Sequence, residues 1–240
     1  MKARLPFPFP LDHEEIARKR ASILNDLMAS DKGFACIPVQ SISEESLQYL
    51  FDAYNDLFLG GSLKRMPVQI TLSSRLTSCA GKFVFARGAF GRIKQAEIRL
   101  SSDYLFRLEF GPFELNGLTV TTPQEAFLLV FEHELCHAVE TMLYGRTGHS
   151  SSFLSLAIGL FGHTKTRHKL PTRRHEAAQE GIFVGSVVAF DYKGEELSGF
   201  ISYIGKTATV MVSSSDGEYR DNRGRRYAKY RVPLSRIHFK

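Results

Sequence analysis

Residues 121–145 read TTPQEAFLLVFEHELCHAVETMLYG, and this stretch decides the fold of the larger part of the chain. Thr122 is placed to cap a helix, with Pro123 at the first helical position and Glu125 as the reciprocal partner of the cap. Gly145 is a natural stop. Most positions in between are apolar, which is typical of a helix buried on all sides. The stretch therefore predicts a core helix.

Within that helix, His133-Glu134-Leu135-Cys136-His137 places two imidazoles four residues apart. Positions i and i+4 lie on one face of a helix, so both imidazoles can reach one ion while Glu134 points to one side of it. Two neutral nitrogen ligands beside a carboxylate that can accept a proton from water suit a zinc hydrolase. A helix with solvated His and Glu side chains is the alternative, and the apolar flanks argue against it.

A catalytic zinc site needs a third protein ligand. The metzincin spacing is excluded because Leu143 occupies the position six residues after His137. The best candidate is His149, because Gly145 and Gly148 allow the chain to reverse and the serines at 150–152 can cap a following helix.

Three further side chains near this stretch have open roles. Glu140 shares the helix face of the two His, where it can be a ligand, a support for the ligands or a member of a surface ion pair. Cys136 is able to coordinate, although a small buried thiol is the favoured interpretation. His163 lies in a basic stretch without clear periodicity and is expected to be solvated.

Four segments of the chain, in order, resemble the SprT-like metallopeptidases, the group that includes Spartan. The likeness runs from about Ser43 to Phe161. The segments are SLQYLFDAYNDLF with GGSL (46–58 and 60–63), RLTSCAGK (75–82), EIRLS (97–101), and HELCH with GHSSSF (133–137 and 148–153).

This resemblance implies an α+β metallopeptidase domain, with helices packed on a small sheet, that binds one Zn²⁺ per chain. By the same resemblance His133, His137 and His149 are the zinc ligands and Glu134 is the catalytic carboxylate. The implied activity is a zinc-dependent endopeptidase acting on proteins bound or crosslinked to DNA. Many family members carry a four-Cys zinc ribbon, which the three separated Cys of this chain exclude.

Composition predicts a folded protein of the cytoplasm, associated with the nucleoid if it binds DNA. Of its 240 residues, 43% are hydrophobic and 23% charged, which predicts a packed core. Three Cys without metal-ligand spacing argue against a disulfide scaffold and against secretion. The first residues lack the apolar core of a signal peptide, and the apolar run at 153–161 is too short to span a membrane.

A net charge of +6 and a pI near 9.2 suggest an acidic partner, and DNA is the expected one. Two basic clusters carry much of the excess, the second of them interleaved with tyrosines at 219, 227 and 230. Modest excess charge also keeps proteins soluble, so both interpretations stay open. The candidate nucleic-acid contacts are Lys165, Arg167, Lys169, Arg173 and Arg174 in the first cluster and Arg223, Arg225 and Arg226 in the second.

The chain divides into four predicted parts. Residues 1–40 form a helical extension behind a cap at Asp12, and 41–165 form the metallopeptidase domain, whose first helix follows a capping box of Ser41 and Glu44. Its strands are expected at 68–72, 82–85 and 96–100. Residues 166–180 form a basic connector. Residues 181–240 contain five short strands and resemble a small SH3-like or Tudor-like β-barrel.

Two other functions remain compatible with these features. One is a nucleic-acid-binding or regulatory protein whose zinc site is structural or vestigial, although Glu134 would then have no purpose. The other is a zinc hydrolase of a non-protein substrate.

Overall fold

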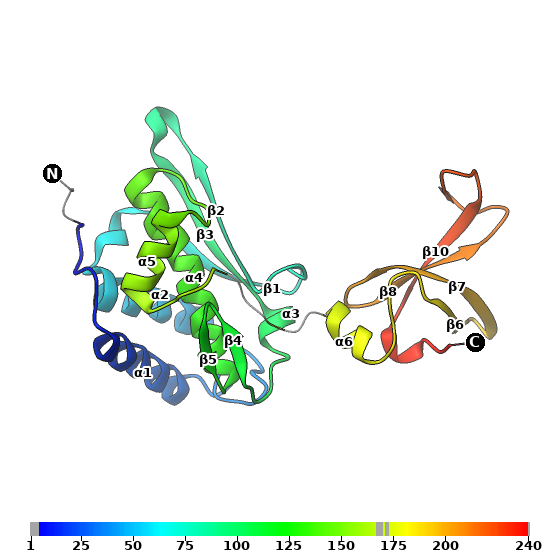
Figure 1. Ribbon diagram of the computed structural model, residues 1–240, viewed down its shortest axis with the longest axis horizontal. Coiled ribbons are helices and arrows are strands. Elements are labelled where there is room, and N and C mark those ends of the chain that lie inside the picture. The colour runs from blue at the N-terminus through cyan, green and yellow to red at the C-terminus, as the bar shows by residue number, and fades with distance from the viewer. Residues whose placement is uncertain (1–4, 167–169, 171–172, 240) are drawn as a thin grey trace. The chain divides into compact units, whose positions relative to one another are not determined.

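The computed structural model describes residues 5–166, 170 and 173–239, which belong to two compact units, Met1–Leu170 and Pro171–Lys240 (Figure 1). Each unit has its own hydrophobic core. The first contains helices and small sheets and the second is mostly β, so the predicted mixed α+β class is confirmed. The boundary falls inside the predicted connector. Arg167 and Lys169 of the first basic cluster lie outside the described residues.

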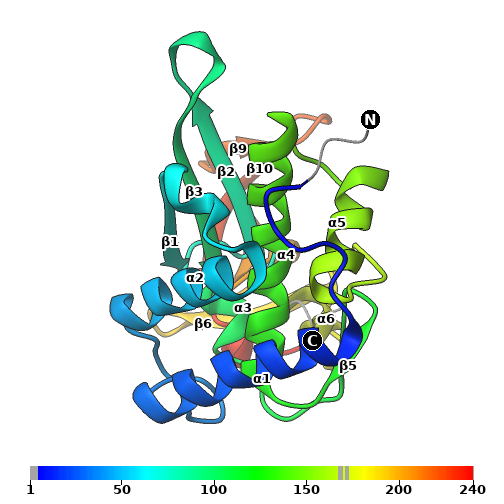
Figure 2. The same ribbon diagram turned by 90° about the vertical axis from the view of Figure 1, so that its left-hand side faces the viewer.

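The central helix of the first unit is α4 (Pro123–Tyr144), and its ends are those the sequence predicts. Thr122 accepts a hydrogen bond from the backbone N–H of Glu125, whose side chain in turn accepts from the backbone of Thr122. Gly145 ends the helix with a φ of 67°, a left-handed conformation that glycine adopts without strain. The helix packs between a sheet and α5 (Ser151–Phe161), as Figure 2 shows.

The sheet has the order β1-β3-β2. Strand β1 (Val68–Ser73) runs parallel to β3 (Ile93–Ser101), and β2 (Gly81–Arg87) pairs antiparallel with β3 through a hairpin. All three strands were predicted. Because β2 is an edge strand packed on α4, one side of it faces the predicted metal helix. A second hairpin, β4 (Phe113–Leu115) with β5 (Leu118–Val120), and the short helix α3 (Ser102–Leu105) were not predicted.

Two helices precede the sheet: α1 (His13–Ser30) and α2 (Glu44–Leu59). Asp12 caps α1, as predicted. The predicted Ser41–Glu44 capping box is wrong, because Ser43 caps α2 by accepting from the backbone N–H of Ser46. The reason lies outside the helix: Asp31 accepts from the backbone N–H of Ser43 and fixes the cap two residues later than the pattern suggests.

A buried ionic network joins α1 and α4. Glu132 has no exposed surface, and its carboxylate accepts from Arg20 at 2.7 and 2.8 Å, from Tyr54 at 2.7 Å and from His163 at 2.8 Å. Burial by itself would raise the pKa of Glu132, but the charge of Arg20 and the bond from His163 hold it at about 2. The expectation of a solvated His163 is therefore wrong: the side chain is fully buried because Glu132 is its partner.

The second unit begins with α6 (Arg173–Gln179) and contains a five-stranded antiparallel sheet of order β6-β7-β8-β10-β9. The strands are Val187–Tyr192, Glu195–Ile204, Ala208–Ser213, Arg226–Val232 and Tyr219–Arg220, in that order. Lys193 and Gly194 both have positive φ in the predicted β6–β7 turn, which matches the twist of a hairpin. In the part of the chain that the structure describes, β6 and β9 do not pair, so the sheet stays open and the SH3-like barrel remains a prediction. The predicted last strand is reduced to a bridge between Ala189 and His238.

Candidate metal centre

The structure brings the three predicted ligands together. One ligand nitrogen from each of His133, His137 and His149 lies within 4.8 Å of the others, and the Nε2 atoms of His133 and His149 are 3.0 Å apart. His133 and His137 project from successive turns of α4, while His149 comes from the loop before α5. Phe153 packs against all three imidazoles, with ring centroids 4.4 to 5.1 Å away. The cluster of three His is therefore buried at His133 and exposed to solvent at His149.

The loop that carries His149 is held by Glu140. This carboxylate is almost fully buried and accepts from the backbone N–H of Gly148 at 2.9 Å and from Thr147 Oγ1 at 3.0 Å. Ser150 and Ser152 donate to its other oxygen. Ser150 stands at the N-terminus of α5, yet its hydroxyl bonds Glu140 rather than the helix. Of the roles left open for Glu140, the structure supports that of holding the third ligand in place.

The same contacts determine which nitrogen of His137 is free. Hydrogen bonds from the loop lower the pKa of Glu140 despite its burial, so it is ionised and can only accept. Thr147 therefore gives its single proton to Glu140 and must accept the 2.6 Å bond from His137 Nδ1. The proton of His137 is then on Nδ1, and Nε2 keeps the lone pair that a metal needs.

His137 is also kept neutral. Burial, and after it the neighbouring His149, lower its pKa to about 4, with Glu140 acting in the opposite direction. A neutral imidazole is the form that binds metal ions, so His137 stays competent as a ligand across the neutral pH range.

Glu134 lies beside this cluster, against strand β2. A Cβ atom added to Gly81 would come within 2.7 Å of Glu134 Oε1, so the strand approaches this closely only because residue 81 is glycine. The backbone N–H of Phe83 hydrogen-bonds the carboxylate. Burial raises the pKa of Glu134 to about 8, and the Phe83 bond offsets this only in part. A buried carboxyl group with a raised pKa beside a group of metal ligands is suited to acid–base catalysis.

The donor set fits a single divalent ion of the zinc type. A tetrahedral ion with bonds of about 2.0–2.1 Å separates its ligand nitrogens by about 3.3 Å, close to the spacing of His133 and His149. Among the described residues, no other group of three His, Cys, Asp or Glu side chains converges in this way. Three protein ligands leave the fourth position open, as catalytic sites do. Cys136 is not one of the three; it is fully buried, with a raised thiol pKa.

We expect the purified protein to hold about one zinc per chain, and His137→Ala to lose it. Elemental analysis after desalting measures both. The matched control is His238→Ala, which removes an exposed imidazole from the second unit and should not change the zinc content. Undiminished zinc in His137→Ala, or two zincs in the wild-type protein, would refute this ligand set.

Glu140→Ala should weaken zinc binding by about 10- to 100-fold, the usual cost of removing a group that orients a ligand. Competition with a chelating dye measures the affinity. Glu140→Gln is the control: its amide oxygen still accepts from Thr147 and Gly148, and its NH₂ can donate to the serine hydroxyls. It should bind zinc more tightly than Glu140→Ala. Equal affinity in the wild-type protein and both variants would show that the loop is held by other contacts.

The predicted nucleic-acid residues are dispersed over both units. Lys165 pairs with Glu114 at 2.6 Å in the first unit, while Arg173 and Arg174 begin α6 in the second. The second cluster is a turn tied together by Asp221, which accepts two backbone N–H bonds and the Arg225 side chain. Arg226 donates to a backbone carbonyl, and Arg223 is exposed.

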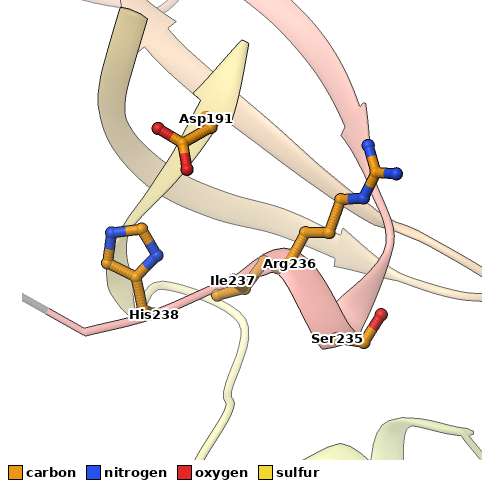
Figure 3. A pocket seen from close by; sticks show the side chains of 5 residues that line it. All are labelled: Asp191, Ser235, Arg236, Ile237 and His238. Carbon is orange, nitrogen blue, oxygen red and sulfur yellow. The ribbon is translucent and has the colours of Figure 1, made fainter. Parts of the chain in front are cut away.

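A pocket of about 470 Å³ lies elsewhere, in the second unit (Figure 3). Asp191, Ser235, Arg236, Ile237 and His238 line it. The imidazole of His238 lies near Asp191 and bonds Glu196 at 3.2 Å, while Arg236 points away from both. The lining of the pocket contains no group of three converging metal ligands among the described residues, unlike the His cluster.

Comparison of the chain with protein-family models, curated proteins and solved structures found no match. Among the described residues, no helix has the length and apolar character needed to cross a membrane.

Sequence reasoning did not identify Thr147, Gly81 and Phe83 as parts of the site. The Ser/Thr-rich stretch seven to twelve residues after Glu140 was a signal that pointed to Thr147. The contacts of Gly81 and Phe83 with Glu134 depend on the packing of β2 on α4, which the local pattern does not encode.

Proposed function

We propose that this chain is a zinc-dependent endopeptidase of the SprT type. The observation that carries the proposal is the convergence of His133, His137 and His149 within 4.8 Å, with Glu134 held beside them by β2. The resemblance of the sequence segments to that family supports the same conclusion independently of the geometry.

In this proposal the three imidazoles hold zinc, which supplies a Lewis acid that polarises a carbonyl and acidifies water to a pKa of about 7. Glu134 accepts the proton of the attacking water and passes it to the amine that leaves. The edge of β2 keeps the carboxylate in position through the Phe83 N–H. Thr147 and Glu140 hold the Nδ1 side of the His137 ring, which would leave Nε2 to bind the ion.

The proposed substrates are proteins bound or crosslinked to DNA. The family resemblance implies this class, and a net charge of +6 is compatible with binding to DNA. We include the second unit in the proposal as a domain of the SH3-like class, supported by its five antiparallel strands and by the Ala189–His238 bridge at the outer side of β6.

Elemental analysis combined with a protease assay tests the proposal. Cleavage of a basic DNA-binding protein is followed with and without DNA, and with and without a zinc chelator. We expect cleavage that requires zinc and is faster with DNA. A zinc protein without peptidase activity would favour a structural site, and chelator-sensitive hydrolysis restricted to non-protein esters or amides would favour a hydrolase of another class.

A further inference from the structure

The hairpin of β2 and β3 projects from the first unit, and its tip extends beyond the ends of α2 and α4 (Figures 1 and 2). The register shifts between Ala86 and Arg87, and a bond from the Gly88 N–H to the Arg92 carbonyl closes the tip. The turn between them is Ala89–Gly91. This element is a two-stranded arm with a short tip rather than a long loop.

The side chain at the tip is Phe90, and it is fully exposed, with a relative accessibility of 102%. Its φ is 59°, a left-handed conformation that costs a bulky residue about 1 kcal/mol or more and that glycine or asparagine adopts readily. The tip therefore carries a phenylalanine although its backbone conformation is strained and its apolar ring is exposed to water. Such a residue is a candidate for contact with a ligand.

The arm is also strongly basic. Lys82, Arg87, Arg92 and Lys94 are exposed, and no Asp or Glu occurs between residues 80 and 96. None of the four forms an ion pair with a carboxylate of the residues that the structure describes. Arg87 has a structural role, because it lies over the Phe85 ring and beside Gly145 at the carbonyl end of α4. Arg92 and Lys94 follow Phe90 by two and four residues, and neither makes a contact of this kind among the described residues.

We propose that this arm binds single-stranded nucleic acid, with Phe90 stacked on an unpaired base and Arg92 and Lys94 on the neighbouring phosphates. Alternating cations and an aromatic face are the chemistry that single strands require. The apolar surface at the tip is limited to Phe90 and Ala89, which is too small for stable insertion into a membrane or for the core of a protein interface.

The root of the arm adjoins the metal centre. Gly81 touches Glu134, and Arg87 lies beside Gly145, four residues before His149. A protein attached to a strand that is held by the arm would be delivered next to the zinc ligands. This delivery rests on the proposed function, whereas binding of the strand does not, so the two are tested separately.

The test uses the full chain with Glu134→Gln as background and a fluorescent 20-nucleotide oligo(dT), with a duplex of the same length as comparison. Phe90→Leu keeps an apolar side chain but removes the stacking face, and should weaken oligo(dT) binding by about fivefold or more without affecting the duplex. Phe90→Tyr should bind like the parent. Arg92→Gln with Lys94→Gln should flatten the slope of log affinity against log salt by up to about 1.4.

The matched control is Arg18→Gln with Lys32→Gln, which removes one exposed charge on α1 and one two residues after its end. Figure 2 shows α1 at the end of the unit opposite the tip of the arm. It should leave the salt slope unchanged. Unchanged binding in Phe90→Leu, or an equal loss on duplex, would overturn the proposal. The proposal would also be overturned if polyglutamate or anionic vesicles bound as tightly as oligo(dT) through the same residues. The arm would then recognise acidic proteins or lipids. Loss of peptidase activity alone bears only on the proposed function.

Discussion

Glu134→Gln should reduce peptide cleavage by at least about a hundredfold, the low end of what general-base catalysis contributes. The amide has nearly the same shape as the carboxylate but cannot accept the proton of the attacking water. Because Glu134 is not among the three converging ligands, the zinc content and the fold should be unchanged. Initial rates at saturating substrate, with elemental analysis of the same sample, measure both quantities.

A steric variant provides an independent check on Glu134. In Gly81→Ala the new methyl group would lie 2.7 Å from Glu134 Oε1, so the carboxylate must shift although its chemistry is intact. We expect lower activity with full zinc occupancy. Gly148→Ala is the matched control, because an added Cβ there meets nothing within 4 Å.

Near-wild-type cleavage by Glu134→Gln would place the proton transfer at another group.

Arg20→Met should lower the free energy of unfolding by about 3–5 kcal/mol, the cost of leaving one member of a buried ion pair without its partner. Glu132 is fully buried and the Arg20 side chain is 18% exposed, so solvent can do little to compensate. Urea denaturation followed by circular dichroism measures the change. Arg18→Met, which removes an exposed charge from the same helix, should stay within about 0.5 kcal/mol of the wild-type protein.

The pH dependence distinguishes this charge effect from lost packing. The pKa of Glu132 is about 2 in the folded protein and ordinary when unfolded, so its contribution is complete above the unfolded value of about 4.5 and is lost as the pH falls through 2. Without Arg20, burial raises the pKa of Glu132, and protonation then relieves the penalty. The difference between the variant and the wild-type protein should therefore be smaller at pH 3 than at pH 7. A difference independent of pH would assign the effect to packing of the arginine stem.

The sequence predicted the parts of the fold whose signals are local. The ends of α4 followed from Thr122, Pro123 and Gly145, and its burial followed from the apolar run. The spacing of His133 and His137 fixed their common face, and His149, predicted from the glycines and serines around it, lies against them in the structure.

Features that depend on distant partners were not predictable in the same way. His163 lies in a stretch that looks solvated, and only Glu132, 31 residues earlier, explains its burial. The cap of α2 shifted from Ser41 to Ser43 because Asp31 holds the preceding chain. Strands β4 and β5 are three residues each, too short to show a period.

The hydrogen bonds of Glu140 have a consequence for how a metal ion would enter and leave the His cluster. Thr147, Gly148 and Ser150 of the loop around His149, with Ser152 at the start of α5, all donate to this one carboxylate, so we expect the loop to keep its shape with and without a bound ion. Many small metal sites instead fold only on binding, and their chelated forms unfold. Here chelation should be a reversible exchange without refolding. Cobalt(II) should therefore enter the emptied site directly, and its visible absorption would report on the geometry of the ligands during catalysis.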